Sequence, residues 1–188
     1  MHRVTYSLGL SLDGYVEDPD GTIDWAAPSP EVFDVARGEL AGVGVHLMGR
    51  RLYETMLYWE NAEQEQNLDE AEVDWAVNWR ALPKVVFSRT LTGVRGSNTR
   101  LATDDLATEI ARLKAEPGDG DIAIGGARLA SHAIDLGLVD EYRMRVHPVL
   151  LGGGLPFFPA HRRRASLELL ESRTLDGGVQ YLRYQVAH

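Results

Sequence analysis

The sequence predicts a single α/β domain with a mostly parallel central sheet, flanked by helices and closed by an antiparallel hairpin at the C-terminal edge. Strand-like and helix-like segments alternate from residue 4 to residue 137, which is typical of parallel strands joined by helices. Residues 141–147 alternate apolar and polar side chains, as expected for a strand with one buried face. The turn DGG at 176–178 separates two strand-like runs and indicates a hairpin. We therefore expect one domain over residues 1–188.

The first half of the chain opens with a β-rich segment from Val4 to Ser11, which ends at an Asp-Gly turn signal. Residues 17–30 have the composition of a loop. Ser29 and Pro30 then suit the N-cap and first turn of a helix, and Pro83 ends a later helix. The expected elements are helices over 29–40, 50–59 and 68–82 and strands over 44–49 and 84–88.

The second half continues the alternation and then changes to strands alone. Asp104 is the expected N-cap of a helix that ends before Gly118. Along 141–147, Tyr142, Met144 and Val146 face one way, and Arg143, Arg145 and His147 face the other. The expected elements are helices over 104–118 and 127–137, and strands over 121–126, 141–147, 165–175 and 178–186.

Composition excludes several classes of function. The formal net charge of -9 argues against general nucleic-acid binding, and the absence of cysteine removes disulfides and thiolate catalysis. Histidines are scattered without the spacing of a metal site, so no metal is expected. No apolar run is long enough for a membrane span, and the N-terminus is not typical of a signal peptide. We expect a cytoplasmic protein that acts on a small molecule and binds neither nucleic acid nor membrane.

Three expected strands end in glycine or in a hydroxyl and an arginine: MGRR at 48–51, FSRT at 87–90 and IGGAR at 124–128. The carboxyl ends of parallel strands share one edge of a sheet, so these motifs should lie along one rim. Bare amides at helix starts and arginine guanidinium groups both bind phosphate. Each motif alone is also compatible with an exposed turn. Together they favour a ligand with several phosphates.

Two further side chains are candidates for work on a substrate. Asp13, in SLDG, lies at the end of the expected central strand, although an aspartate in a turn is common. Trp25 is the large apolar side chain of the 17–30 loop. It either covers a site or anchors the loop to the core.

These same segments resemble a known family. SLDGYVEDPDGTIDW, LMGRRLYETMLYW, VVFSRTL and the stretch from IARLKAEPG to GGGLPFF are similar, in order from about residue 4 to residue 158, to the reductase domain of the bifunctional riboflavin-biosynthesis deaminase-reductase. They also resemble the dihydrofolate-reductase-like family that shares its fold. GLVDEYRMRVHPVLLGGG is the most specific part and favours the riboflavin-type branch. The resemblance implies a dihydrofolate-reductase-like fold.

The resemblance also implies NADPH as the hydride donor. Gly49, Arg50 and Arg51 would meet the 2′-phosphate or pyrophosphate, and Ser88 and Arg89 would flank the adenine end. The pyrophosphate cradle would follow the next strand, and the nicotinamide site would lie near the first. The residues implied for these two parts are Ile124, Gly125, Gly126, Ala127, Arg128 and Leu129 for the cradle, and Leu8, Gly9 and Val16 for the nicotinamide.

The reaction implied is hydride transfer to a C=N or C=O of a small heterocyclic or aminosugar-type substrate, such as a phosphorylated 5-amino-6-ribosylaminouracil or a dihydrofolate. Asp13 would orient or protonate the substrate, Trp25 would close the site, and Glu31 is the reserve acid. The position that carries the acid in dihydrofolate reductases is Pro30 here, with Glu31 displaced by one. The alternatives are a non-catalytic NADP(H)-binding or sensor protein, and an α/β domain whose arginines bind nothing. We also expect a homodimer, formed through the 142–147 strand or the final hairpin.

Overall fold

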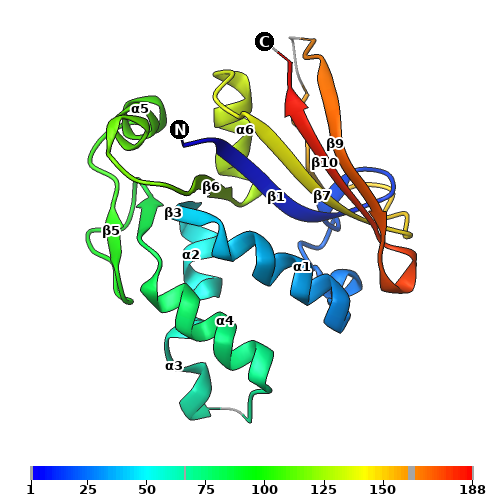
Figure 1. Ribbon diagram of the computed structural model, residues 1–188, viewed down its shortest axis with the longest axis horizontal. Helices are drawn as coiled ribbons and strands as arrows, with labels where there is room; N and C mark the ends of the chain where they lie inside the picture. Colours follow the sequence, from blue (N-terminus) through cyan, green and yellow to red (C-terminus); the bar gives the residue numbers. More distant parts are fainter. Residues whose placement is uncertain (1, 66, 161–163, 188) are drawn as a thin grey trace.

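The computed structural model describes residues 2–65, 67–160 and 164–187. Its centre is an eight-stranded sheet in the order β5-β4-β3-β6-β1-β7-β10-β9 (Figure 1). The first six strands in that order are parallel, and β10 and β9 form the antiparallel edge, as predicted. The strands are β1 (Val4–Ser11), β3 (Val43–Gly49), β4 (Lys84–Phe87), β5 (Thr99–Leu101), β6 (Asp121–Gly125), β7 (Glu141–His147), β9 (Leu167–Thr174) and β10 (Gln180–Val186), with a separate pair β2 (Tyr15–Glu17) and β8 (Leu155–Pro156).

Helices cover both faces of the sheet. The helices α1, α2 and α4 pack on one face, where Leu40 of α1 and Trp79 of α4 share a buried cluster with Met48 of β3. The helices α5 and α6 pack on the other face. Among the described residues, none of these helices is long and apolar enough to cross a membrane. Their bounds are α1 (Pro30–Ala41), α2 (Arg50–Met56), α3 (Tyr58–Glu65), α4 (Glu70–Ala81), α5 (Leu106–Ala115) and α6 (Ala127–Asp135), with short 3-10 helices η1 (Asp24–Ala26) and η2 (Asp176–Gly178).

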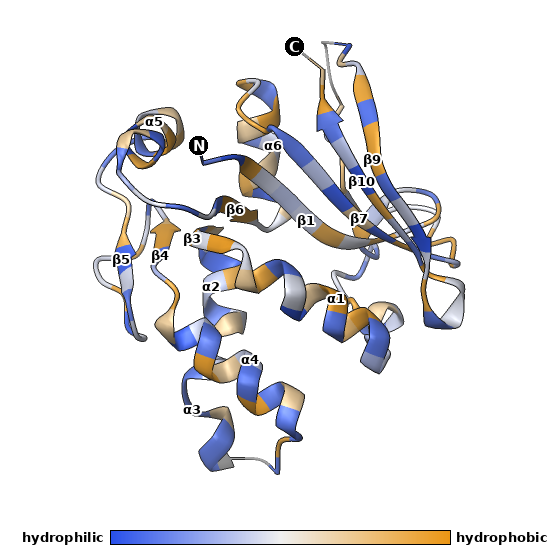
Figure 2. Cartoon of the chain, viewed as in Figure 1, coloured by the Kyte–Doolittle hydropathy of each residue, from blue (hydrophilic) through white to orange (hydrophobic). Residues whose placement is uncertain are grey.

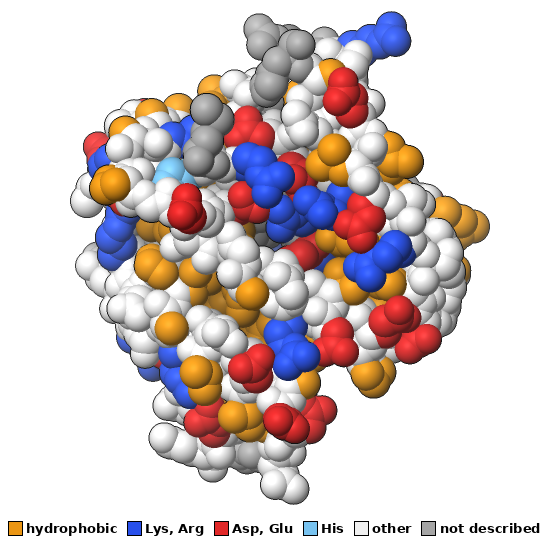
Figure 3. All heavy atoms as spheres, viewed as in Figure 1, with side chains coloured by type: hydrophobic (Ala, Val, Ile, Leu, Met, Phe, Trp, Pro, Cys, Tyr) orange, Lys and Arg blue, Asp and Glu red, His pale blue; other side chains and the backbone are white. Residues whose placement is uncertain are grey.

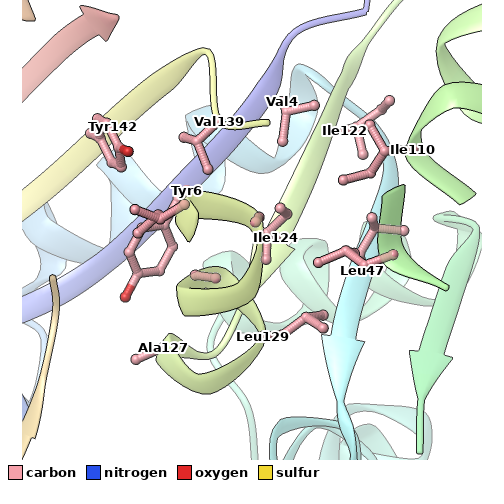
Figure 4. Packing of buried hydrophobic residues seen from close by; sticks show 14 of the residues in the cluster. Val4, Tyr6, Leu47, Ile110, Ile122, Ile124, Ala127, Leu129, Val139 and Tyr142 are labelled. Carbon is pink, nitrogen blue, oxygen red and sulfur yellow. The ribbon is translucent and has the colours of Figure 1, made fainter. Parts of the chain in front are cut away.

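The larger core lies between the sheet and helices α5 and α6. Tyr6 and Ile124, from the neighbouring strands β1 and β6, are almost fully buried there beside Leu129 of α6 (Figure 4). Strands β3, β4 and β6 carry hydrophobic residues at their centres (Figure 2). Removing this apolar surface from water stabilises the folded state by about 25 cal/mol per Å². The packed core holds the strand ends in fixed register.

Most expected elements are confirmed, and two details are wrong. The Ser29 hydroxyl accepts from the amide of Val32, so Ser29 is the N-cap of α1. The N-cap of α5 is Asp105, because its carboxylate reaches the amide of Thr108, three residues on. Asp104 lies one position too early for that bond.

The helix expected over 50–59 is two helices, α2 and α3, which meet at Leu57. The change of helix direction at Leu57 brings the carboxylate of Glu60 within 2.9 Å of the amide nitrogen of Ser97, from which it accepts a hydrogen bond. This is a tertiary contact that the local pattern does not contain. Three short strands, β2, β5 and β8, also lack a signal in the sequence, since each has only two or three residues.

Candidate active site

The sheet opens between β6 and β1. Strand β6 ends at Gly125, and its last pairing with β1 joins Ile124 to Tyr6. Strand β1 continues to Ser11 with β7 beside it on its other edge. The chain leaves β1 toward α1 on one face and leaves β6 toward α6 on the other, so β6 and β1 form a topological switch point (Figure 1). Ligands of open α/β sheets bind in the crevice at such a point.

Helix α6 begins directly at this opening. Gly126 is its N-cap, has φ +86° and provides no side-chain cap. The first helical hydrogen bond runs from Ala130 to the carbonyl of Gly126. The amides of Ala127, Arg128 and Leu129 therefore have no acceptor within the described chain. Unpaired amides and the positive end of the helix dipole form an environment that favours an anion.

The two glycines before α6 have different reasons to be glycine. A side chain at Gly125 would overlap the buried ring of His46 and the side chain of Leu52, so close packing requires its absence. A Cβ at Gly126 would make only ordinary contact with Leu52, but the residue has a left-handed backbone conformation, which glycine adopts at little cost. Gly125 therefore lets neighbouring side chains pack beneath the strand end, while Gly126 turns the chain and exposes the amides of α6.

The other two arginine motifs lie along the same rim. Gly49 pairs with Phe87 and Met48 with Gly125, so β4, β3 and β6 end almost level. Arg50 bridges two of the motifs, because it binds Glu54 at 2.7 Å and the Thr90 hydroxyl at 3.0 Å.

The positively charged groups on this rim differ in how they are paired. The Arg51 guanidinium lies 3.9 Å from Glu17. Arg89 and Arg128 are exposed and have no ion pair within the described chain. They are therefore the rim cations with the fewest competing contacts. The Ser88 hydroxyl accepts from the amides of Thr90 and Leu91 and stabilises the turn itself.

Several residues implied by the resemblance can reach a ligand only through their backbone. The side chains of Val16, Ile124, Ala127 and Leu129 belong to the hydrophobic core, and Leu8 packs against it. Gly9 is different. A Cβ atom at Gly9 would lie 3.4 Å from Nε2 of His147, so the strand surface there borders the imidazole ring.

Asp13 holds a loop in place. Its carboxylate accepts hydrogen bonds from the Ser11 hydroxyl at 2.6 Å, from the Gly152 amide at 2.7 Å and from the Leu151 amide. The bond from Ser11 is the largest cause that lowers the pKa of Asp13, followed by the two backbone amides. The carboxyl group is therefore ionised at neutral pH. This state suits an acceptor that orients a substrate and does not support proton donation from Asp13.

The three residues expected to act on substrate are not gathered in one cavity. Trp25 borders a cavity of about 270 Å³ at the carboxyl end of β7. Glu31 lines a different hollow of about 710 Å³ between α1 and the edge strands, and its carboxylate accepts from the Asp176 amide at 2.7 Å. Glu31 thus ties α1 to the turn of the final hairpin. Neither hollow is lined by Asp13.

The sequence did not single out His147 as a site residue. The imidazole is the last side chain of β7, is 7% exposed and packs edge-on against Trp25, with ring centroids 5.6 Å apart. Burial lowers the pKa of His147, and the nearby Arg145 guanidinium lowers it further. The strand alternation placed His147 on the polar face with Arg143 and Arg145, but its contact with Trp25 depends on folding of the 17–30 loop.

Comparison with known proteins agrees with this architecture. The sequence matches the family described as the RibD C-terminal domain over residues 2–181. It is 31% identical to the uncharacterized protein YyaP of Bacillus subtilis (strain 168), over 97% of this chain and 94% of that protein.

Solved structures of similar fold include a protein from Shewanella sp. PV-4 with a provisional assignment to riboflavin biosynthesis. The two chains are 24% identical, with 99% of each covered and a TM-score of 0.77. Acinetobacter baumannii RibD is 22% identical, and the match covers 100% of this chain and 59% of that one, with a TM-score of 0.73. The predicted dihydrofolate-reductase-like fold is confirmed. The chain therefore belongs to the RibD C-terminal domain family, a family of reductase-type domains.

Proposed function

We propose that the protein is an NADPH-dependent reductase that transfers hydride to a C=N or C=O carbon of a small heterocyclic or aminosugar-type substrate. The observation that carries this proposal is the uncapped start of α6 at the opening between β6 and β1. A riboflavin-type pyrimidine substrate is favoured over dihydrofolate, because Glu31 is engaged with the amide of Asp176 and does not border the Trp25 cavity.

The residues at the rim fit NADPH. The amides of Ala127, Arg128 and Leu129 would hold the pyrophosphate, and the exposed guanidinium groups of Arg89 and Arg128 would bind phosphate oxygens. Gly9 leaves the surface of β1 without a side chain at the place proposed for the nicotinamide. NADPH supplies the hydride when bound. The protein would supply position, exclusion of water and electrostatic complementarity.

The substrate would lie beyond the end of β1, near Trp25. Asp13 would keep the 151–154 loop in place through the amides of Leu151 and Gly152, and its remaining acceptor capacity could orient a polar substrate group. Trp25 would cover the reacting carbon and exclude water. The single domain over 1–188 would contain both sites.

Arg89 and Arg128 have no ion pair within the described chain and should contribute directly to NADPH affinity. Arg128→Ala and Arg89→Ala are each expected to weaken NADPH binding by about tenfold or more, since a hydrogen bond between charged groups contributes about 1.5–3 kcal/mol. Binding is measured by quenching of the four tryptophans. Arg37→Ala is the control, because Arg37 pairs with Asp34 and Asp74 on the surface of α1 and α4.

Three outcomes separate the alternatives. Wild-type protein should bind NADPH much more tightly than NADH, and equal affinity would remove the 2′-phosphate contact from the proposal. If neither nucleotide binds, the reductase proposal fails. If NADPH binds but neither pyrimidine-linked aminosugars nor dihydrofolate are reduced, the non-catalytic sensor is favoured.

We further propose a homodimer formed through the edge strand β9. Leu167, Leu169 and Leu170 on this strand are 38%, 56% and 44% exposed. Figure 2 shows hydrophobic segments along β9. An unpaired edge with exposed leucines favours association with a second copy. Light scattering should therefore report a dimer that Leu169→Lys dissociates. Leu136→Lys is the control, since Leu136 is 55% exposed but follows α6. A monomeric wild-type protein would rule out this interface.

A further inference from the structure

Two polar groups without hydrogen-bond partners border the cavity of about 270 Å³ at the end of β7. The first is the imidazole of His147, whose ring nitrogens make no hydrogen bond within the described chain although the residue is only 7% exposed. The second is Nε1 of Trp25, which is buried and has no acceptor. Buried polar atoms in proteins are nearly always paired, so the unpaired Nε1 of Trp25, beside an imidazole that makes no hydrogen bond to the described chain, points to a missing ligand.

The rest of the described cavity wall, which includes the acidic residue Asp176, makes no hydrogen bond to either group. Val32, Pro148, Val149 and Val179 contribute apolar surface. The hydroxyl of Ser29, which also lines the cavity, is occupied by the amide of Val32. The volume lies below the range of about 300–1,000 Å³ that is typical of sites for drug-sized ligands. A single planar ring is therefore a suitable occupant.

The position of the imidazole links this cavity to the proposed nicotinamide site. Nε2 of His147 faces the bare backbone of Gly9, where a Cβ would lie 3.4 Å away, while the indole of Trp25 meets the ring at an interplanar angle of 87°. The ring is thus held between strand β1 and the 17–30 loop. A substrate ring in the cavity would lie next to the end of β1.

His46 provides an instructive contrast. Its Nδ1 is also buried without a partner, but the ring packs against Trp79 and beneath Gly125, and it lines none of the hollows found among the described residues. His46 therefore has a packing role, whereas His147 is accessible from a cavity.

We propose that His147 and Trp25 together determine substrate specificity, by donating hydrogen bonds from the imidazole and from Nε1 of Trp25 to acceptor atoms of a planar heterocycle in this cavity. This inference rests on the proposed reductase function for the identity of the bound ring as substrate. A site built to donate such bonds discriminates against rings that lack acceptors, because the buried Nε1 of Trp25 and the imidazole of His147 then stay unpaired. An uncharged imidazole is sufficient, since it carries one N–H donor.

The test uses 5,6-diaminouracil as the probe, a single planar ring with two carbonyl acceptors. Binding to the full chain is measured by calorimetry for wild type, His147→Leu, His147→Gln and Trp25→Phe. His147→Leu and Trp25→Phe are each expected to weaken binding by about tenfold, as for loss of a buried hydrogen bond. His147→Gln should retain most of the affinity, because its amide nitrogen can take the position of Nε2.

NADPH binding by the same variants keeps the two proposals distinguishable. Each variant should still bind NADPH, because the proposed phosphate contacts at the start of α6 are retained, and this binding also establishes that the variant is folded. If NADPH binds but the probe binds wild type and His147→Leu equally, the specificity role of His147 is wrong. If the probe responds as expected but wild type binds no NADPH, the recognition site stands and the reductase proposal fails. Equal loss in His147→Gln and His147→Leu would reduce His147 to a packing role and overturn the inference.

Discussion

Replacing Gly154 with alanine is expected to destabilise the fold by several kcal/mol, far more than the same replacement at Gly152. Gly154 has φ +123°, and a Cβ there would overlap the carbonyl oxygen of Glu17 and lie 2.8 Å from the carbonyl carbon of Asp18. Both atoms belong to the backbone, and Glu17 is fixed in strand β2 by its pairing with Leu155. Overpacking costs about 1–3 kcal/mol and backbone strain adds about 1–3 kcal/mol.

Gly152→Ala is the matched control in the same loop. Gly152 also has a positive φ, +72°, but no atom lies within 4 Å of its built Cβ. Its replacement should cost only the left-handed conformation, about 1–2 kcal/mol. Urea unfolding of the two variants measures the difference in free energy. Similar values would mean that the β2–β8 pair yields easily and does not hold the loop.

The Gly154 contact also bears on the active site. The 151–154 loop is fixed at one end by Asp13, through the amides of Leu151 and Gly152, and at the other by the close approach of Gly154 to β2. A substitution that disturbs this loop only slightly, such as Gly152→Ala, should therefore leave NADPH binding at the start of α6 nearly unchanged.

The order of elements could be predicted because local patterns determine it. Ser29 followed by Pro30 gives a cap and a first turn that need no tertiary contact, and alternation in 141–147 correctly placed Arg143 and Arg145 on one face. Local patterns did not predict the helix boundaries that depend on tertiary packing. The break at Leu57 brings Glu60 to Ser97, 37 residues away, and no periodicity encodes that contact.

The candidate site was predictable to the same extent. Carboxyl ends of parallel strands share an edge, so the sequence alone places the motifs at Gly49, Ser88 and Gly125 on one rim. The hydrogen-bond partners of individual side chains could not be predicted from the sequence. Asp13, expected to orient or protonate the substrate, binds amides 138 and 139 residues away and is an ionised acceptor, which suits the orienting role. The cavity beside His147 is likewise assembled from three distant segments.

Acidic and basic side chains form a network on the α1 face of the sheet, and we expect its disruption to lower the free energy of unfolding strongly. Basic and acidic side chains intermix on this face (Figure 3), in and around the hollow that Arg143 and Glu31 line. At its centre the carboxylate of Glu141 is 1% exposed on its side chain. It accepts from Arg143 at 2.7 Å, from Arg183 at 2.9 Å and from Arg3 at 2.9 Å.

Glu141→Gln is expected to destabilise the protein by about 3 kcal/mol or more at pH 7. The neutral amide leaves Arg143, whose side chain is 7% exposed, with Asp121 as its one ion-pair partner among the described residues. Breaking a buried ion pair costs about 3–5 kcal/mol. Glu171→Gln is the control, because Glu171 is 30% exposed and binds Arg173 and Arg183 near the surface. That change should cost less than about 1 kcal/mol. Comparable losses in the two variants would mean that burial of the network contributes little.

The stability that Glu141 contributes should depend on pH. Burial raises the pKa of Glu141, but hydrogen bonds and charges from Arg183 and Arg143 outweigh it, so the pKa lies below the ordinary value of 4.5. A carboxylate with a depressed pKa stabilises the fold fully above its unfolded-state pKa, and this contribution disappears as the pH falls through the folded-state pKa. The difference in unfolding free energy between wild type and Glu141→Gln should therefore be constant from pH 7 to about pH 5 and should shrink at lower pH. A difference that stays constant in acid would show that the effect does not come from the charge of Glu141, because glutamine has nearly the same shape as glutamate and does not titrate.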